Sequence, residues 1–331
     1  MPRLGVRLEN DPRLSLGDLV DLAQLAEQRG FEFIWVPEGG GRDALTLLTT
    51  FARATLNIKL ATGILPIFNR TPMTMAMSAA GLAMASGNRF VLGLGTGHKG
   101  PVESGHGVPF GRPVGRMRET VEIIRSLLRG DAVTTDGKDF KMQNARLGKA
   151  AEGVEVPVYI AALGPQMVAL TGQMANGVLL NWTASAYLPT AVEQLQDAAQ
   201  AAGRSASAVD VAGYVRMAVG GDEAAARRDL QKQISRYASL PFYRDFFAGS
   251  GFAKEMQAAG EALEAGDGER AADFISQEMQ DEVAVVGSAE HCVAEIERRR
   301  LLGLRLPVIA PYAVGADVKE SYVRAIEAFQ G

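Results

Sequence analysis

The sequence predicts an α/β protein that forms a closed (β/α)8 TIM barrel, and three observations lead to this prediction. Short apolar segments alternate with helical patterns along the whole chain, which is typical of a parallel sheet. The apolar segments lack a period of two, as expected for strands that helices cover on both faces. The 331 residues suffice for one barrel, which typically needs about 250 residues plus insertions.

Eight apolar runs are the predicted strands. In the run from Phe31 to Val36, apolar and polar residues do not alternate cleanly, which indicates a strand buried on both faces. The predicted strands cover residues 4–8, 31–36, 58–62, 89–94, 158–161, 178–180, 211–219 and 306–310. Because composition does not change sharply along the chain, we expect a single domain over 1–331 and a closed barrel rather than an open sheet.

Helical patterns separate these strands. Ser15 and Asp18 form a predicted capping box, and Gly30 ends the helix that begins there. Pro72 suits the first turn of a helix that runs to about Ser86. The other predicted helices include 43–54, 166–175, 188–199, 223–237 and 318–329. Two segments exceed the repeating unit: a glycine-rich loop at 96–113, and an insertion at about 239–281 after the seventh strand and its helix.

Composition narrows the class of protein. With 34 basic and 38 acidic residues the net charge is −4, which argues against a partner such as nucleic acid or an acidic membrane. Cys292 is the single cysteine, so an intramolecular disulfide and a cysteine-based zinc site are excluded. Three widely spaced histidines make a histidine metal site unexpected, so we predict no metal. Since no leader or spanning segment is recognisable, we expect a cytoplasmic protein.

The carboxyl ends of the strands carry the active site in such barrels, so residues after each apolar run are candidates. The segment Leu163-Gly164-Pro165-Gln166-Met167 joins a strand to a helix, whose first free amides would bind an anion. The competing interpretation is an ordinary strand-to-helix loop. Gly93-Leu94-Gly95-Thr96-Gly97 resembles a dinucleotide fingerprint, but no helix follows at once, and we therefore reject that interpretation.

Two titratable side chains near strand ends are candidate catalytic residues. Glu38 follows the second predicted strand, and its alternative role is an ion pair with a nearby arginine such as Arg42. His98 lies in the glycine-rich loop after the fourth strand, and its charge can change near neutral pH. The alternative for His98 is a surface or structural histidine.

Taken together, these residues resemble the luciferase-like oxidoreductases, in the branch that uses the deazaflavin coenzyme F420. The resemblance covers nearly the whole chain, with its motifs in the expected order. The segments that carry it are Phe33-Ile34-Trp35-Val36-Pro37-Glu38, 41–46, 61–64, Asn69-Arg70-Thr71-Pro72, 86–97, 105–110, Ala161-Ala162-Leu163-Gly164-Pro165 and Val285-Val286-Gly287-Ser288. The family implies a (β/α)8 barrel with a helical insertion after strand 7, and a homodimer.

The resemblance also implies a cofactor site. A non-prolyl cis peptide at Gly63-Ile64 would lie behind the ring, and Glu38 would contact the ring. The cofactor phosphates would lie near 97–100 and at the 163–167 segment. The residues implied to bind the cofactor are Glu38, Gly63, Ile64, Leu65, Thr96, Gly97, His98, Leu163, Gly164, Pro165, Gln166 and Met167.

Two departures from the family pattern bear on activity. Gly39 stands where sugar-phosphate and alcohol dehydrogenases of this branch have a histidine, and His98 stands where they have a glutamate. Their acid/base pair is therefore not carried over. The Glu-His-His motif of many flavin monooxygenases is absent as well, which favours F420 over FMN.

The expected function is hydride transfer between the deazaflavin C5 and a small organic substrate, because the cofactor carries the redox chemistry. Glu38 and His98 would act as catalytic residues, with His98 donating or accepting a proton. The expected substrate-binding residues are Arg7, Asn181, Trp182, Phe242 and Phe246. Two alternatives remain open: an FMN-dependent luciferase-like monooxygenase, and a non-catalytic barrel that only binds the cofactor.

Overall fold

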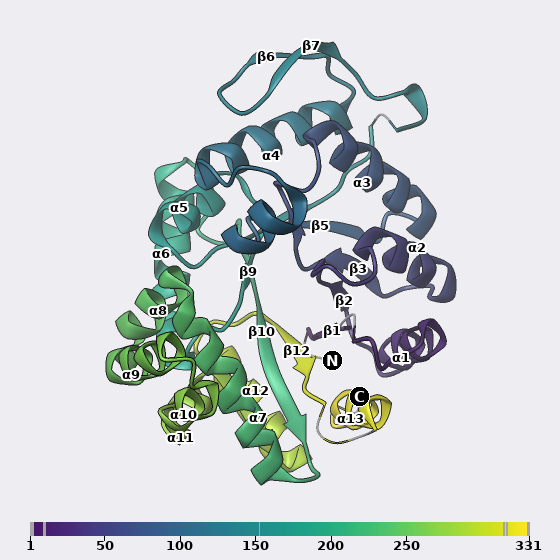
Figure 1. Cartoon of the computed structure of the whole chain (residues 1–331). Helices are drawn as coiled ribbons and strands as arrows, with labels where there is room; N and C mark the ends of the chain where they lie inside the picture. The colour runs from purple at the N-terminus through teal and green to yellow at the C-terminus, as the bar shows by residue number, and fades with distance from the viewer. Residues whose placement is uncertain (1–2, 9–10, 152, 314, 316, 330–331) are drawn as a thin grey trace. The chain divides into compact units, whose positions relative to one another are not determined.

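The computed structural model describes residues 3–8, 11–151, 153–313, 315 and 317–329 (Figure 1). Parallel strands form its main sheet, and their order is that of a (β/α)8 TIM barrel, as predicted. The strands of this sheet within the described residues are β1 (Gly5–Arg7), β2 (Phe33–Val36), β3 (Lys59–Thr62), β4 (Leu65–Pro66), β5 (Phe90–Gly95), β8 (Val158–Ala161), β9 (Gly177–Leu180), β10 (Asp210–Val219), β11 (Ala284–Gly287) and β12 (Leu306–Pro311).

Helices follow most strands. They are α1 (Leu16–Gln28), α2 (Ala44–Ala54), α3 (Pro72–Ser86), α4 (Pro113–Arg129), α5 (Pro165–Met174), α6 (Leu188–Ala201), α7 (Glu223–Arg236), α8 (Pro241–Phe247), α9 (Ala253–Glu264), α10 (Gly268–Asp273), α11 (Gln277–Val283), α12 (Ala289–Leu301) and α13 (Val318–Glu327). The predicted capping box is confirmed, since Ser15 and Asp18 exchange hydrogen bonds at the start of α1. Among the described helices, none has the length and apolar character needed to cross a bilayer.

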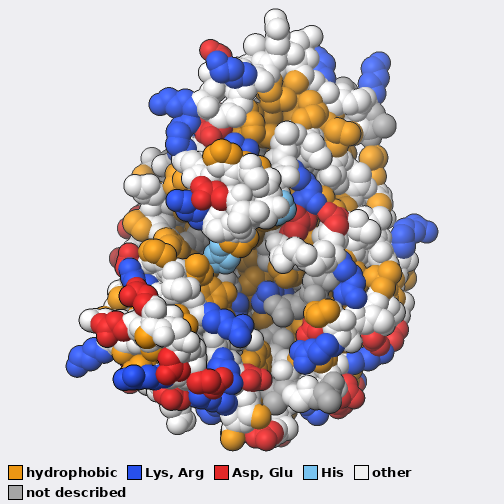
Figure 2. All heavy atoms as spheres, viewed as in Figure 1, with side chains coloured by type: hydrophobic (Ala, Val, Ile, Leu, Met, Phe, Trp, Pro, Cys, Tyr) orange, Lys and Arg blue, Asp and Glu red, His pale blue; other side chains and the backbone are white. Residues whose placement is uncertain are grey.

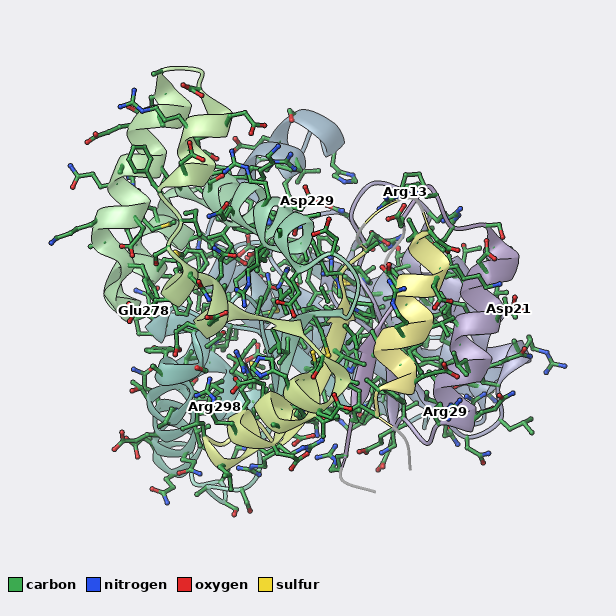
Figure 3. The ribbon with its side chains drawn as sticks, turned by 90° about the horizontal axis from the view of Figure 1, so that it is seen from below. Arg13, Asp21, Arg29, Asp229, Glu278 and Arg298 are labelled. Carbon is green, nitrogen blue, oxygen red and sulfur yellow. The ribbon has the colours of Figure 1, made fainter. Side chains whose placement is uncertain are left out.

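The helices bury one face and expose the other. On α1 the buried residues are Leu19, Leu22, Ala23 and Ala26, a spacing that puts them on one face. Figure 3 shows Asp21 of α1 and Glu278 of α11 directed outward, away from the strands of their own units. This pattern explains why the apolar periodicity of the sequence located the helices.

The chain divides into two compact units. The N-terminal unit comprises residues 7–179 and 194–210, and the C-terminal unit comprises the described part of 1–6, 180–193 and 211–331. In the N-terminal unit β2, β3, β5, β8 and β9 pair in parallel, with partners such as Trp35↔Ala61, Ala61↔Val91 and Leu94↔Ile160. Their side chains make the core of this unit.

The N-terminal unit also contains a hairpin that the sequence did not predict. The strands β6 (Val133–Asp136) and β7 (Lys141–Ala145) pair antiparallel and lie beside α4 (Figure 1). Glu119 on α4 holds the turn, because its carboxylate accepts hydrogen bonds from the amides of Lys138, Asp139 and Phe140 at 3.0–3.2 Å.

In the C-terminal unit the long strand β10 pairs with two strands. Residues Ala212 to Met217 pair with β12, and Arg216 to Val219 pair with β11. The eight predicted strands are all present, but the prediction left out β11 and the two-residue strand β4. Ala284 both ends α11 and begins β11, so no turn residue separates the two elements. The inserted helices α8 to α11 lie together, and Figure 2 shows acidic and basic side chains mixed over them.

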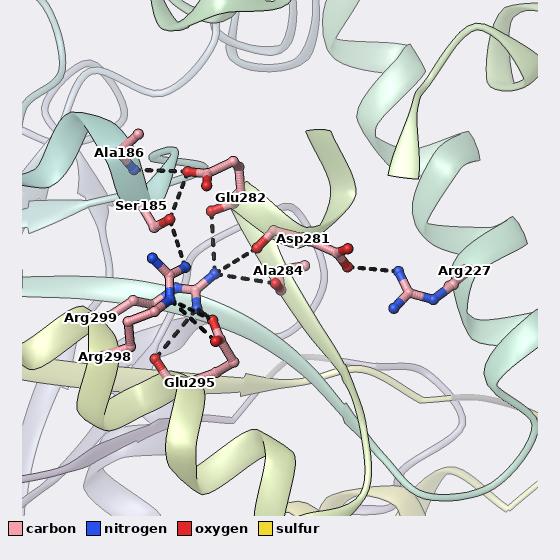
Figure 4. A network of polar contacts seen from close by, with 9 residues as sticks. All are labelled: Ser185, Ala186, Arg227, Asp281, Glu282, Ala284, Glu295, Arg298 and Arg299. Carbon is pink, nitrogen blue, oxygen red and sulfur yellow. Dashed lines mark hydrogen bonds and ion pairs between the residues drawn. The ribbon is translucent and has the colours of Figure 1, made fainter. Parts of the chain in front are cut away.

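Arg299 anchors the end of this insertion to α12 (Figure 4). The residue is only 2% exposed, and its guanidinium donates to the carbonyls of Asp281, Glu282 and Ala284 at 2.9–3.3 Å. It also donates to the carboxylate of Glu295 at 2.6 Å. The carbonyls of Asp281 and Glu282 lie in the last turn of α11, where no N–H group of the helix can donate to them. Arg299 supplies these missing donors.

Candidate functional site

The loop after β3 contains the cis peptide that the resemblance implied. The Gly63–Ile64 bond is cis, and the amide of Glu38 donates to the Ile64 carbonyl at 3.2 Å. Thr62 holds this region to β5, since its hydroxyl donates to the Gly93 carbonyl and accepts from the Gly93 amide, both at 2.8 Å. Leu65 follows in β4, which pairs with the end of β5.

Two glycines of β5 make this close approach possible. A Cβ on Gly93 would lie 1.9 Å from the Thr62 carbonyl oxygen, and one on Gly95 would lie 2.5 Å from Ile64 Cγ1. Neither position therefore accepts a side chain without a shift of its neighbours. The glycine pattern thus has a packing cause, which agrees with our rejection of a dinucleotide fingerprint.

Glu38 ends in a carboxylate whose two oxygens differ in environment. Oε1 accepts a hydrogen bond from Arg70, with which Glu38 forms an ion pair, and the Glu38 side chain is 12% exposed. Oε2 is buried and has no hydrogen-bond partner among the described residues. Such an unpaired buried oxygen calls for an explanation, and a ligand that donates a hydrogen bond is one.

The ion pair with an arginine that the sequence offered as the alternative role of Glu38 is present, but its partner is Arg70 and not Arg42. Arg42 donates instead to the backbone carbonyl of Leu14 at 2.7 Å. Arg70 lies 32 positions after Glu38, so its role depends on the fold and could not be deduced from local sequence.

Arg70 bridges Glu38 to a second carboxylate, that of Asp43. Burial pushes the pKa of Asp43 up, but hydrogen bonds from Thr46 and the charge of Arg70 outweigh it, so the pKa lies below 3.8. Burial likewise opposes the charge of Arg70, yet the two carboxylates raise the pKa of Arg70 above its usual value. Asp43 and Arg70 are therefore both charged at neutral pH.

The predicted loop after β5 contains Thr96, Gly97 and His98, and it includes a short π-helix at Pro101–Gly105. His98 is exposed as a residue, although atoms around its imidazole partly remove it from water and lower the pKa of His98 below 6.5. This direction favours the neutral form of the ring at pH 7.

The glycine-rich loop is tied to the segment that precedes Arg70. The side chain of Asn69 hydrogen-bonds His106 at 3.0 Å, and the rings of Phe68 and Phe110 stack with centroids 4.6 Å apart. The sequence placed His106 in this loop without a partner. These contacts fix the loop relative to Arg70 within the N-terminal unit.

The start of α5 is the segment where the sequence predicted an anion site. Gly164 is the N-cap, no side chain caps the helix, and Pro165 occupies its first turn. The first amide that bonds within the helix is that of Val168, which donates to the Gly164 carbonyl at 3.0 Å. The amides of Gln166 and Met167 thus belong to the turn whose N–H groups can bind an anion, and Leu163 directly precedes this turn.

A cluster in the C-terminal unit gathers the predicted substrate-binding residues Asn181 and Trp182. Arg216 donates from both terminal nitrogens to Asn181 Oδ1 at 3.1 Å, and its guanidinium lies 3.4 Å from the centre of the Trp182 ring. Asn181 in turn donates to the hydroxyl of Tyr243 at 3.0 Å. Trp182 adopts a φ of 53°, which is uncommon for a bulky residue and frequent at functional sites.

Aromatic residues of the insertion complete this cluster. Tyr243 is buried, and burial is the main reason that the pKa of Tyr243 rises to about 12, so its hydroxyl keeps its proton at neutral pH. Phe242 is 52% exposed, and Phe246 contacts Tyr187 edge to face at 5.4 Å. Among the predicted substrate-binding residues the sequence included Phe242 and Phe246 but neither Tyr243 nor Arg216. Arg7, the remaining candidate, is the half-buried last residue of β1.

The pattern of the luciferase-like monooxygenase family matches residues 3–306. A 5,10-methylenetetrahydromethanopterin reductase of Methanolobus tindarius is 30% identical over 96% of this chain and 95% of its own length. The structure of an F420-dependent tetrahydromethanopterin reductase from Methanopyrus kandleri superposes with a TM-score of 0.83 at 26% identity, covering 99% and 98% of the two chains.

A monooxygenase from Streptomyces bottropensis shares the fold at 19% identity, with a TM-score of 0.71 over 99% of this chain and 97% of its own. At that identity the likeness concerns the fold alone. The family pattern and the relative from Methanolobus each cover most of the chain, and both lead to the same assignment. The chain belongs to the luciferase-like monooxygenase family.

Proposed function

We propose that this protein is an oxidoreductase that uses coenzyme F420 and transfers a hydride between the deazaflavin C5 and a small organic substrate. The relative from Methanolobus is named a reductase, and the structure from Methanopyrus is described as F420-dependent. At 30% and 26% identity over nearly the whole chain, these relatives support the same cofactor here.

The observation that carries the proposal is the unpaired Oε2 of Glu38. It lies on the residue whose amide bonds the cis peptide loop, where the family resemblance places the cofactor ring. A ring that bears a hydrogen-bond donor would satisfy this oxygen. The chemistry of the residues present therefore fits the cofactor.

The remaining cofactor contacts follow from the N-terminal unit. Gly63, Ile64 and Leu65 would support one face of the ring. The amides of Gln166 and Met167 would hold a phosphate at the start of α5, because a helix N-terminus favours negative charge. Thr96, Gly97, His98, Leu163, Gly164 and Pro165 would complete the site.

When bound, the cofactor supplies a hydride donor or acceptor at C5. The protein contributes orientation and a site from which water is excluded. Since His98 is neutral at pH 7, it can accept a proton from the substrate or return it. The proposed substrate-binding residues are Asn181, Trp182, Phe242 and Phe246 of the C-terminal unit and Arg7 of the N-terminal unit. We also propose a homodimer, which light scattering would test.

Binding of F420 and FMN to the cofactor-free protein, followed by the fluorescence of Trp35 and Trp182, tests the proposal. We expect tight binding of F420 and negligible binding of FMN. Tight FMN binding with substrate-dependent oxygen consumption would instead support the monooxygenase alternative, because deazaflavins react poorly with oxygen. F420 binding without turnover of any substrate in a broad panel would support the non-catalytic alternative.

A further inference from the structure

The arginine that pairs with Glu38 is itself held by a second carboxylate. Arg70 directs one terminal nitrogen to Glu38 and the other to Asp43. Asp43 is fixed in turn, because its Oδ1 caps α2 and accepts from the Thr46 amide and hydroxyl at 2.7 and 2.9 Å. The three side chains form a series that starts at the N-terminus of α2 and ends at Glu38.

We propose that Arg70 is a positioning residue, which orients Glu38 so that Oε2 accepts a hydrogen bond from an N–H or O–H group of the bound cofactor. This inference rests on the proposed function, since it concerns the same site. A planar guanidinium that meets a carboxylate with each terminal nitrogen restricts the rotation of both partners. Arg70 is suited to this role, as its side chain is only 19% exposed.

The different hydrogen bonding of the two carboxylate oxygens of Glu38 supports the proposal. Arg70 uses Oε1, while Oε2 is buried without a donor among the described residues. An ion pair made only for stability is expected to satisfy both oxygens, because a buried acceptor without a donor costs free energy. The arrangement instead keeps one acceptor available in a fixed direction, which is the preorganisation that a binding site needs.

A double-mutant cycle on F420 binding tests whether Arg70 acts through Glu38. We expect Glu38→Gln and Arg70→Met each to raise the Kd by about 10- to 100-fold, the range for a hydrogen bond to a charged group. The Kd of the double variant should lie within about threefold of the Kd of the weaker-binding single variant, because both substitutions remove the same contact. If the two losses multiply, Arg70 acts independently of Glu38 and the proposal is wrong.

Two milder variants sharpen the result. Arg70→Lys keeps the charge but cannot bridge both carboxylates with a planar fork, so we expect a loss of about 3- to 10-fold. Asp43→Asn retains the Oδ1 cap of α2 and removes only the oxygen that binds Arg70, so about 2- to 5-fold is expected. Arg129→Met is the matched control. Arg129 is the last residue of α4 and forms an exposed ion pair with Asp131, so its replacement should leave the Kd unchanged.

A readout without ligand separates this inference from the proposed function. In crystals of the ligand-free protein, we expect Glu38 to hold one conformation in the wild type and to lose it in Arg70→Met. Retention of the same conformation in that variant would overturn the inference, whatever the affinity for F420. If instead the conformation is lost and the wild type does not bind F420, the proposed cofactor is wrong while the positioning role of Arg70 is supported.

Discussion

Glu295 in the C-terminal unit and Glu38 in the N-terminal unit are both partly buried glutamates paired with arginine. They differ in how many of their carboxylate oxygens accept a hydrogen bond. Both oxygens of Glu295 accept hydrogen bonds, from Arg298 at 3.1–3.2 Å and from Arg299 at 2.6 Å. Only one oxygen of Glu38 has a donor among the described residues, although the side chain is 12% exposed.

We propose that this difference distinguishes a structural network at Glu295 from a binding site at Glu38. In the Glu295 network both carboxylate oxygens and both terminal nitrogens of Arg299 have hydrogen-bond partners within the protein. The network therefore holds α11 and β11 against α12. In the Glu38 network one acceptor has no donor among the described residues, and we propose that a ligand supplies it. Ion pairs of similar appearance are therefore expected to respond differently to mutation, the first in stability and the second in affinity.

The largest expected effect is on the structural side. Arg299→Met removes a buried charge and leaves Glu295 and three carbonyls with fewer donors, so we expect the free energy of unfolding to fall by about 3–5 kcal/mol. Arg298→Met is the control, because Arg298 pairs with the same Glu295 but has a side chain that is 43% exposed, and a loss of about 1 kcal/mol or less is expected. Urea denaturation measures both, and equal losses would contradict the comparison.

The next effect concerns the packing behind the candidate cofactor site. Gly93→Ala would place a methyl group against the Thr62 carbonyl, so we expect a loss of about 1–3 kcal/mol in stability together with weaker F420 binding. Gly81→Ala on α3 meets open space and should raise stability by about 0.5–1 kcal/mol. Thermal unfolding and F420 titration check the pair, and a Gly93→Ala protein with unchanged stability would rule out the packing role.

The smallest effect is a dependence on pH. Burial pushes the pKa of Glu295 up, but the hydrogen bond from Arg298 and the charge of Arg299 outweigh it, so the pKa lies below 4.5. A carboxyl whose pKa is lowered on folding stabilises the protein fully above its unfolded pKa, and this contribution is lost as pH falls through its folded pKa.

We therefore expect the stability difference between the wild type and Glu295→Gln to be constant from pH 7 to about 5 and to shrink below that. Urea denaturation across this pH range measures the difference. A difference that stays unchanged down to about pH 3 would show that Glu295 does not lose its role on protonation.

Much of the fold could be predicted because buried strands and amphipathic helices leave a periodic pattern. The capping box at Ser15 and the alternation of strands and helices were read correctly for this reason. The hairpin of β6 and β7 was missed because its residues are mostly exposed and polar. The strand β11 was missed because α11 runs into it without a turn.

The site was predicted only where local sequence determines it. The start of α5 was predicted from a short contiguous segment, and the cis peptide at Gly63–Ile64 was implied by the family resemblance; the structure contains both. The pairing of Glu38 with Arg70 instead depends on two loops that the fold brings together. Arg216 was not predicted because it is a single charged residue within an apolar strand, and nothing in the local sequence indicates that it hydrogen-bonds Asn181.

The most direct test compares Glu38→Gln and Glu295→Gln in the same two measurements, the Kd for F420 and the free energy of unfolding. We expect Glu38→Gln to weaken F420 binding by about 10- to 100-fold while the free energy of unfolding changes by less than about 0.5 kcal/mol. Glu295→Gln should do the reverse, with an unchanged Kd and a lower stability. If Glu38→Gln lowers stability and leaves F420 binding unchanged, the unpaired oxygen of Glu38 does not mark a ligand site.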